Sequence, residues 1–352
     1  MPIKKYLEKI EKPNMKVYKK VKQNWDNIAK PLNSLGVLEE MHAKIAAIYN
    51  CERINIAKRC VVPICADNGV VEEGVTQTGQ NVTAIVTQNF LDGNTSVCKF
   101  AQIAHCDVVP VDLGVAQDIK SERLIIHKLS YGTKNIAKGP AMSKDTAYEA
   151  IAFGIDLVGE LKNKGYKLIA TGEMGIGNTT TSSAVAAVLL DKEPELVTGY
   201  GSGLSKEGLA TKIEVIKTAL KVNKPEQTDP VDVIAKVGGY DIAGMCGMFI
   251  GGAVHKVPII IDGFISGVSA LCAVRLCPDI KDYLLASHVS NELAAKLVLQ
   301  ELDLQAVINA QMCLGEGTGA VALMPLLDMT NTLYNEMPTF AATNIEAYQH
   351  FT

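Results

Sequence analysis

Tyr166-Lys-Leu-Ile-Ala170 leads directly into Thr171-Gly-Glu-Met-Gly-Ile-Gly-Asn178 in the middle of the chain. This is a short apolar run followed by a loop rich in glycine, and a helical pattern begins at about Thr179. An apolar run that is bounded by turn residues and followed by a helix is typical of a parallel strand covered on both faces. The segment therefore predicts one strand–loop–helix unit of an α/β protein.

Four other apolar runs end in polar loops of a similar kind. They lie at 60–66, 107–111, 257–261 and 283–286. Together the five runs predict an α/β fold with an open, mostly parallel sheet flanked by helices, as in Rossmann-like proteins. Because ligands bind such sheets beyond the carboxyl ends of the strands, the polar loops are expected to line the site. Pro63, Pro110 and Pro258 lie inside three of the runs and remove backbone donors, which leaves the limits of those strands open.

The length and composition predict about two domains with a substantial core. The chain has 352 residues, of which 48% are hydrophobic and 20% are charged. Residues from about 51 to 291 contain all five apolar runs and are expected to form the large α/β domain. Residues 1–50 and about 292–352 show helical patterns, so the two chain ends are expected to form a small, mostly helical part that includes the loop 315–319.

Several classes of protein are disfavoured by the composition. A net charge of −4 and an aromatic content of 5% argue against nucleic-acid binding. The sequence lacks an apolar run of about 18 residues and a signal-peptide pattern at its start, so we expect a cytoplasmic protein without membrane contact. The nine cysteines have no Cys-x-x-Cys spacing and the six histidines no metal-binding spacing, so neither disulfides nor a metal is expected.

Two glycine loops are candidates for phosphate binding. In the segment 171–181, three glycines allow backbone N–H groups to approach an anion, and a helix start at Thr179 would add its positive end. The alternative is a tight turn that binds nothing. The second loop, 199–204, precedes a helix with Lys206 and Lys212, either of which could supply a positive charge or simply be solvated.

Acidic residues follow several of the predicted strands. Glu316 lies between glycines in Gly315-Glu-Gly-Thr-Gly319, where a partly desolvated carboxylate could act as a general base, although a helix C-cap with a solvent-facing Glu is equally compatible with the pattern. Asp67, Glu173 and Asp262 could form an acidic ring around a ribose, or cap helices. His288 follows a predicted strand and could also line the site.

Taken together, these loops resemble the CobT family, the nicotinate mononucleotide:base phosphoribosyltransferases of cobamide nucleotide-loop assembly. The resemblance spans nearly the whole chain. It rests on Ser34-Leu-Gly36, Leu38-Glu39, Asp67-Asn-Gly-Val70, Glu73-Gly-Val75, Val82-Thr83, Gly172-Glu-Met-Gly-Ile-Gly-Asn-Thr-Thr180, Gly238-Gly239, Asp262-Gly-Phe-Ile-Ser266, Ser287-His288, Leu314-Gly-Glu-Gly-Thr-Gly319 and Asn335-Glu-Met337.

The resemblance implies an enzyme that transfers phosphoribose from nicotinate mononucleotide to an aromatic base, with inversion at C1′, to give an α-ribotide and nicotinate. By position, Glu316 would be the general base that deprotonates the acceptor. No cofactor or metal would take part, and the enzyme would be a homodimer. The substrate- and phosphate-binding residues implied are Glu173, Gly175, Ile176, Gly177, Asn178, Thr179, Thr180, Gly201, Lys212, Asp262, Ser290 and Gly315.

Two departures from the family pattern concern the acceptor base. Members that use benzimidazole usually carry Ser-Pro and a Gln where this chain has Thr78-Gly79 and Val86. If Thr78 and Val86 line the acceptor pocket, that pocket is less polar, and a benzimidazole, a purine or a phenolic base could be the acceptor. A phenolic acceptor would resemble the ArsAB branch, in which two related subunits form a heterodimer. In a further departure, Ser205-Lys206 replaces an acidic pair, which leaves the role of Lys206 open.

Two other functions remain as alternatives. A non-catalytic subunit could hold a nucleotide without turnover, although the retained Glu173 and Glu316 argue against it. A dehydrogenase is disfavoured because no strand–Gly-x-Gly-x-x-Gly–helix unit with a later acidic residue is present.

Overall fold

The computed structural model describes residues 2–350 and has a parallel sheet at its centre. The strands of the described chain are β1 (Arg59–Ala66), β2 (Asp107–Val108), β3 (Val111–Gly114), β4 (Ile125–Ile126), β5 (Leu168–Met174), β6 (Ile259–Ile261) and β7 (Leu284–Ala286). They form one sheet in the order β4-β3-β1-β5-β6-β7, with β2 also paired to β1, and every pairing is parallel. The predicted fold class is confirmed, and β4 is a strand that no apolar run indicated.

The three prolines affect their strands differently. Pro63 lies inside an uninterrupted β1, between the stretches that pair with β2 and with β3. Pro110 falls in the gap between β2 and β3, so the apolar run at 107–111 forms two short strands. Pro258 immediately precedes β6. A missing N–H is thus tolerated where the neighbouring ladder is interrupted or has not yet begun.

The helices cover both faces of the sheet. In the described residues they are α1 (Lys4–Leu7), α2 (Met15–Asn27), α3 (Val37–Tyr49), α4 (Asn81–Asp92), α5 (Ser96–Ile103), α6 (Lys144–Asn163), α7 (Asn178–Leu190), α8 (Pro194–Val197), α9 (Lys206–Asn223), α10 (Pro230–Val237), α11 (Tyr240–His255), α12 (Phe264–Leu276), α13 (Ala295–Glu301), α14 (Thr318–Glu336) and α15 (Phe340–Thr343), with 3₁₀ turns at Gly69–Glu73 and Pro278–Tyr283.

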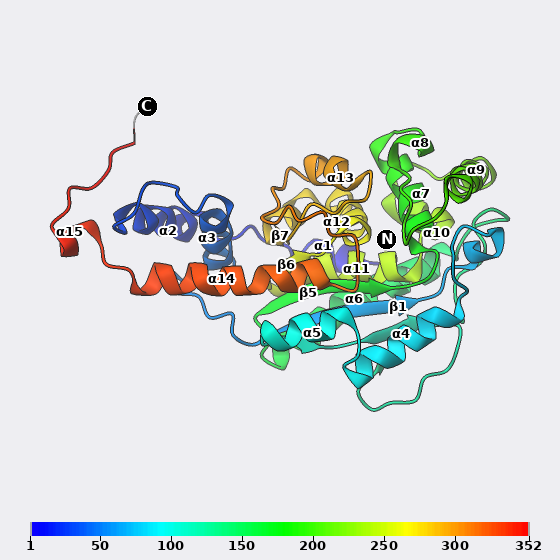
Figure 1. Ribbon diagram of the computed structural model, residues 1–352, viewed down its shortest axis with the longest axis horizontal. Coiled ribbons are helices and arrows are strands. Elements are labelled where there is room, and N and C mark those ends of the chain that lie inside the picture. The colour runs from blue at the N-terminus through cyan, green and yellow to red at the C-terminus, as the bar shows by residue number, and fades with distance from the viewer. Residues whose placement is uncertain (1, 351–352) are drawn as a thin grey trace.

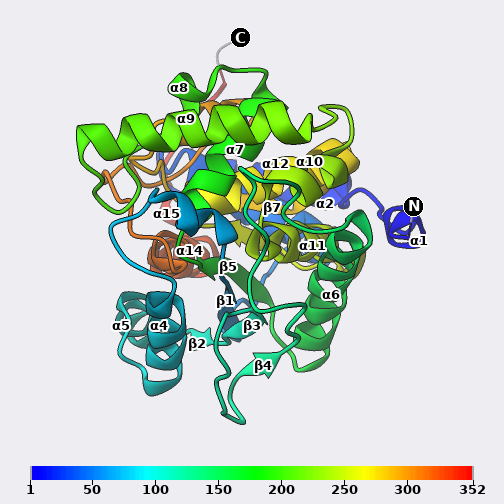
Figure 2. The same ribbon diagram turned by 90° about the vertical axis from the view of Figure 1, so that its right-hand side faces the viewer.

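Alternating side chains of the central strand divide the core in two. Cys60, Val62 and Ile64 of β1 point into a core that contains α6, α7, α10, α11 and α12. Val61 and Cys65 point into a second core with α3, α4, α5 and α14. Figure 2 shows α4 and α5 on one side of the sheet and α6 and α11 on the other. A strand buried on both faces must be apolar throughout, which explains why the run reads as continuous rather than alternating.

Helices from the two chain ends lie together. Figure 1 shows α2 and α3 beside α14, beyond one end of the sheet. Trp25 of α2 packs on His42 of α3 and on Tyr334 of α14, with ring centroids 5.4 and 5.0 Å apart. Arg59 of β1 donates two hydrogen bonds of 2.6 Å to Asp328, which joins α14 to the sheet. The division into two domains near 50 and 292 stays a prediction. No helix within residues 2–350 is long and apolar enough to cross a bilayer.

Candidate active site

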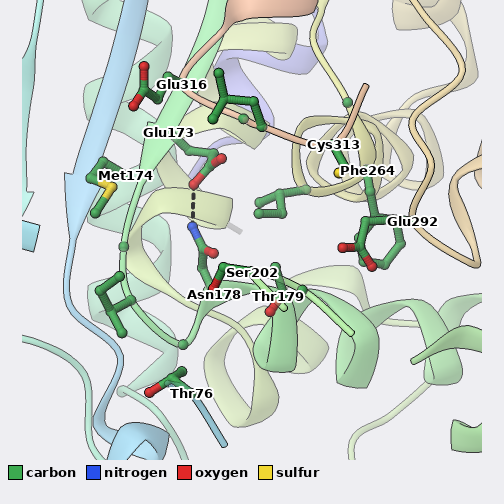
Figure 3. Close-up of a pocket in the computed structure, with 18 of the residues that line it drawn as sticks. Thr76, Glu173, Met174, Asn178, Thr179, Ser202, Phe264, Glu292, Cys313 and Glu316 are labelled. Atoms are coloured by element: carbon green, nitrogen blue, oxygen red, sulfur yellow. Dashed lines mark hydrogen bonds between the residues drawn. The ribbon is translucent and has the colours of Figure 1, made fainter. Parts of the chain in front are cut away.

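A cavity of about 410 Å³ lies where the loops after β5, β6 and β7 meet α4 and the loop before α14. Figure 3 shows part of its lining. The residues singled out from the sequence that line it are Glu173, Gly175, Ile176, Gly177, Asn178, Thr179, Gly201, Lys212, Asp262, His288, Ser290, Gly315, Glu316, Thr78 and Val86. The carboxyl edge of the sheet therefore gathers polar loops from distant parts of the sequence, as expected for a parallel sheet.

The glycine loop after β5 forms one end of the cavity. Gly177, with φ of +94°, is the N-cap of α7, and no side chain in the described residues caps that helix. The helix begins at Asn178, one residue before the predicted start. An uncapped helix N-terminus presents free N–H groups and a partial positive charge, which suit an anionic group.

Lys212 of α9 lies at the same end of the cavity. Its Nζ donates to Thr179 Oγ1 at 2.8 Å and to the Gly199 carbonyl at 3.3 Å. Burial lowers the pKa of Lys212 to about 8, and the nearby Glu292 carboxylate opposes that shift. The sequence left Lys206 and Lys212 equivalent, but Lys206 is exposed and does not line the cavity.

Thr180 and Asp67 are placed differently from the sequence interpretation. Thr180 was expected among the phosphate-binding residues, but its side chain is fully buried and does not line the cavity. Successive helical residues point about 100° apart, so only Thr179 of the pair faces the cavity. Asp67 was expected in an acidic ring, but it is buried and accepts a hydrogen bond from Ala116 N at 2.7 Å instead.

Two buried carboxyl groups, Glu173 and Asp262, line the cavity, and Asp241 is linked to Glu173 through Asn178. Glu173 and Asp241 both accept hydrogen bonds from the Asn178 amide, the second at 3.1 Å. Burial, together with the Asp241 charge, raises the pKa of Glu173 to about 8. Asp262 accepts from the backbone N–H groups of Gly317 at 3.2 Å and Ala320 at 2.9 Å, yet burial raises its pKa to about 7. At neutral pH some of these carboxyl groups are therefore protonated, and their total negative charge is smaller than the number of groups.

Glu316 stands in a strained loop at the edge of this cluster. Its φ is +62°, and it lies between Gly315 and Gly317, which have φ of +87° and +94°. The segment leads into the N-terminus of α14, so the helix C-cap considered from the sequence is wrong. Glu316 Oε2 accepts a hydrogen bond from Val97 N at 3.2 Å, at the start of α5, and burial raises the pKa of the carboxyl group. A residue held at positive φ marks a position that the surroundings enforce.

The wall contributed by α4 is mostly apolar. Val82 and Val86 line the cavity one helical turn apart, with Thr78 preceding them and Met174 at the end of β5. Apolar side chains spaced in this way suit the face of a flat ring. His288, across the cavity, bonds Ser287 Oγ at 3.1 Å through Nδ1, and burial lowers its pKa, so it stays uncharged at neutral pH.

Several lining residues were missed from the sequence. They are Thr76, Gln77, Glu292 and Cys313, whereas Tyr200 and Phe264 lie in motifs that were noted without assigning these side chains a role. Cys313 is close to the Gly315-Glu316 loop, and Thr76 and Gln77 follow the Glu73-Gly-Val75 motif, which are the signals that could have found them. Glu292 had no such signal, and burial raises its pKa. Within residues 2–350, no group of three or more His, Cys, Asp or Glu side chains has an arrangement that could hold a metal ion.

Comparison with known proteins identifies the family. A family model described as "Phosphoribosyltransferase" matches residues 10–345. A protein of Clostridium acetobutylicum named nicotinate-nucleotide–dimethylbenzimidazole phosphoribosyltransferase is 44% identical over 99% of both chains. A protein of the same name from Acetivibrio thermocellus is 47% identical over 94% of both. The crystal structure of CobT from Thermus thermophilus has a TM-score of 0.89 and 34% identity, covering 95% of this chain and 100% of that one. The chain belongs to the CobT family of phosphoribosyltransferases.

As a member of the CobT family, the chain is an enzyme of the glycosyltransferase type. The resemblance drawn from the sequence motifs is confirmed. The motifs Gly172–Thr180 and Leu314–Gly319, far apart in sequence, contribute to one cavity in this CobT-family fold. The geometry of the cavity is the basis for inferring its ligand and its catalytic side chain.

Proposed function

We propose that this chain transfers phosphoribose from nicotinate mononucleotide to a lower-ligand base of cobamides, with inversion at C1′, and releases nicotinate and an α-ribotide. The observation that carries the proposal is the layout of one cavity. One side of the cavity is formed by Thr179, at the N-terminus of α7, and by the Lys212 ammonium. The Glu316 carboxylate lies on the opposite side, as Figure 3 shows for Thr179 and Glu316. This order matches a donor phosphate, a ribose in the middle and an acceptor base.

The donor would occupy the end at the start of α7. Its phosphate would meet the backbone N–H groups of Gly177 and Thr179, at the start of α7, and the Lys212 ammonium. Its ribose would lie against Glu173, Asp262 and Ser290, all of which line the cavity. With a pKa of about 8, Glu173 is largely protonated at neutral pH and can donate a hydrogen bond to a ribose oxygen.

The acceptor would lie between Glu316 and the wall of Val82, Val86, Thr78 and Met174. The names of the relatives favour a dimethylbenzimidazole-type base. Purine and phenolic bases are the other acceptors to test, because Val86 offers the ring no polar partner. Such a wall also excludes water from the reacting carbon.

The reaction would be an inverting displacement. Glu316 would take the proton from the acceptor N–H or O–H, which strengthens it as a nucleophile towards C1′. In nicotinate mononucleotide C1′ is bonded to a positively charged pyridinium nitrogen. Breaking this bond returns the electron pair to that nitrogen, which becomes neutral, and releases nicotinate. Holding the phosphate and ribose fixes C1′ in line between nucleophile and leaving group.

The deciding experiment is a product assay. The protein is incubated with nicotinate mononucleotide and, in parallel, dimethylbenzimidazole, adenine, phenol or p-cresol, and α-ribotides and nicotinate are separated by chromatography. Wild type should form one α-ribotide, Glu316→Gln should form at least about 100-fold less, and Glu336→Gln, an exposed position on α14, should match wild type.

Other outcomes would change the proposal. An undiminished Glu316→Gln would refute the general-base role and leave the family intact. Binding of nicotinate mononucleotide without release of nicotinate from any base would favour a binding subunit. The proposal includes a dimeric, cytoplasmic enzyme, formed by two copies of this chain or with a paralogue. Light scattering of the purified chain, alone and mixed with any paralogue encoded beside it, would test the assembly.

A further inference from the structure

Thr83 joins the apolar wall to the glycine loop. It belongs to α4, where its neighbours Val82 and Val86 face the cavity, but Thr83 itself is fully buried and points away from the cavity. Its Oγ1 accepts a hydrogen bond from the backbone N–H of Ile176 at 3.1 Å. Ile176 lies in the middle of the loop at the start of α7, between Gly175 and Gly177. One buried hydroxyl thus contacts the loop that would bind the phosphate.

This contact crosses the edge of the sheet. α4 packs in the core on one face, and α7 packs in the core on the other. The loop fits closely against the end of β1, since a Cβ on Gly175 would stand 2.1 Å from the Ala66 carbonyl oxygen, and its own turn is closed by the bond from Asn178 N to Gly175 O at 3.0 Å. The bond from Ile176 N to Thr83 adds a hydrogen bond that ties the loop to a helix from the opposite layer.

The Thr83 hydroxyl lies near the buried carboxyl group of Asp67. Asp67 Oδ2 accepts a hydrogen bond from Ala116 N at 2.7 Å, whereas its buried Oδ1 has no hydrogen-bond partner in the described residues. The nearby Thr83 hydroxyl lowers the pKa of Asp67 against the effect of burial. A hydroxyl has one proton and two lone pairs, so Thr83 Oγ1 can accept from the Ile176 N–H and still carry its own proton.

We propose that Thr83 is a positioning residue that fixes the position of the phosphate-binding loop 175–179 relative to the acceptor wall formed by Val82 and Val86 of α4. It contacts neither substrate and acts through Ile176 on one side and through α4 on the other. The inference rests on the proposed function, because it assumes that the loop 175–179 binds the donor phosphate and that Val82 and Val86 face the acceptor. Losing the hydroxyl would release the loop while the fold remains.

Three variants test the inference. Thr83→Val keeps the shape of the side chain and removes its hydroxyl, whereas Thr83→Ser keeps the hydroxyl and removes the methyl group. Thr87→Val is the matched control, because Thr87 is equally buried on α4 but its hydroxyl bonds the Thr83 carbonyl at 2.7 Å within the helix. The dissociation constant for nicotinate mononucleotide is measured by calorimetry, kcat in the product assay, and folding by thermal unfolding.

Thr83→Val should weaken binding of nicotinate mononucleotide about tenfold and lower kcat about tenfold at saturation, while Thr83→Ser and Thr87→Val stay within about twofold of wild type. Unchanged binding in Thr83→Val, or equal losses in Thr87→Val, would overturn the positioning role. A wild type that binds the mononucleotide but makes no product refutes the proposed function only, since the binding comparison still decides the role of Thr83. A wild type that does not bind the mononucleotide refutes both.

Discussion

Gly172 of β5 lies directly against the backbone carbonyl of Glu316: a Cβ on Gly172 would stand 2.4 Å from that oxygen. The contact joins the strand that carries Glu173 to the loop that carries Glu316, and both parts are backbone, so neither can rotate away. The distance between Glu316, the proposed base, and Glu173, the proposed ribose-binding acid, is thus controlled by the absence of a side chain at position 172.

Gly172→Ala should therefore displace the 315–317 loop. Because a shift of about 1 Å in a reacting group can cost about 100-fold in rate, we expect kcat to fall by about that factor, with a smaller change in thermal stability. Gly139→Ala is the control, since a Cβ there meets nothing within 4 Å and its φ is not positive. Steady-state kinetics and thermal unfolding of both variants check the prediction, which fails if the two variants have the same kcat.

Stability should depend on pH through Glu173. Its pKa is about 8 in the folded protein, against 4.5 for an unperturbed glutamate carboxyl group. Between these values the folded state holds a proton that the unfolded state has lost, so the free energy of unfolding should fall as pH rises from 4.5 to 8. The slope is about 1.4 kcal/mol per pH unit for one proton.

Glu173→Gln removes this dependence because the amide does not titrate. The difference in unfolding free energy between variant and wild type should move in favour of the variant by about 3 kcal/mol between pH 5 and pH 7. Urea denaturation at several pH values measures it. A difference that stays constant over this range would mean that Glu173 is already ionised in the folded protein at pH 5.

Lys212 should bind the donor through its charge. Lys212→Met should raise the KM for nicotinate mononucleotide about 30-fold, as expected for the loss of a charged hydrogen bond to phosphate. In wild type, KM should rise from pH 7 to pH 9, because the ammonium, with a pKa of about 8, loses its proton over that range. Lys206→Met, exposed in the first turn of the same helix, should change KM by less than about twofold. Equal effects of the two variants would place the phosphate elsewhere.

Local sequence patterns were sufficient for the sheet apart from β4, and for most of the cavity. The strand–loop–helix unit at 166–178 combines an apolar run with glycines, both of which are local signals, and parallel strands necessarily bring such loops to one edge. The predicted roles of the lining side chains go beyond this geometry and stay proposals.

The failures have specific physical causes. Thr180 was grouped with Thr179 by adjacency in sequence, but one step along a helix rotates a side chain out of the cavity. Glu292 enters the cavity only because the segment after β7 passes the loop at Gly199, where a Cβ would stand 2.0 Å from its carboxylate. Asp67 follows a strand like Asp262, yet it turns to Ala116 instead. Contacts between segments that are distant in sequence determine where the Glu292 and Asp67 side chains lie, and a local sequence pattern cannot predict such contacts.

The acceptor preference should depend on Val86. Its side chain lies on the cavity wall formed by α4. An amide at this position could bond the second ring nitrogen of a benzimidazole, whereas p-cresol has a single hydroxyl and no second polar group for the amide to bond. Val86→Gln should therefore raise the ratio of benzimidazole product to p-cresol product, in a competition of equal concentrations, by about fivefold. Ile85→Gln is the matched control, because that neighbouring side chain is 53% exposed and does not line the cavity. If Ile85→Gln shifts the ratio as much as Val86→Gln, or if neither does, the acceptor lies away from α4. In that case Glu316 would have to deprotonate it from another side, and the apolar wall would need a different occupant.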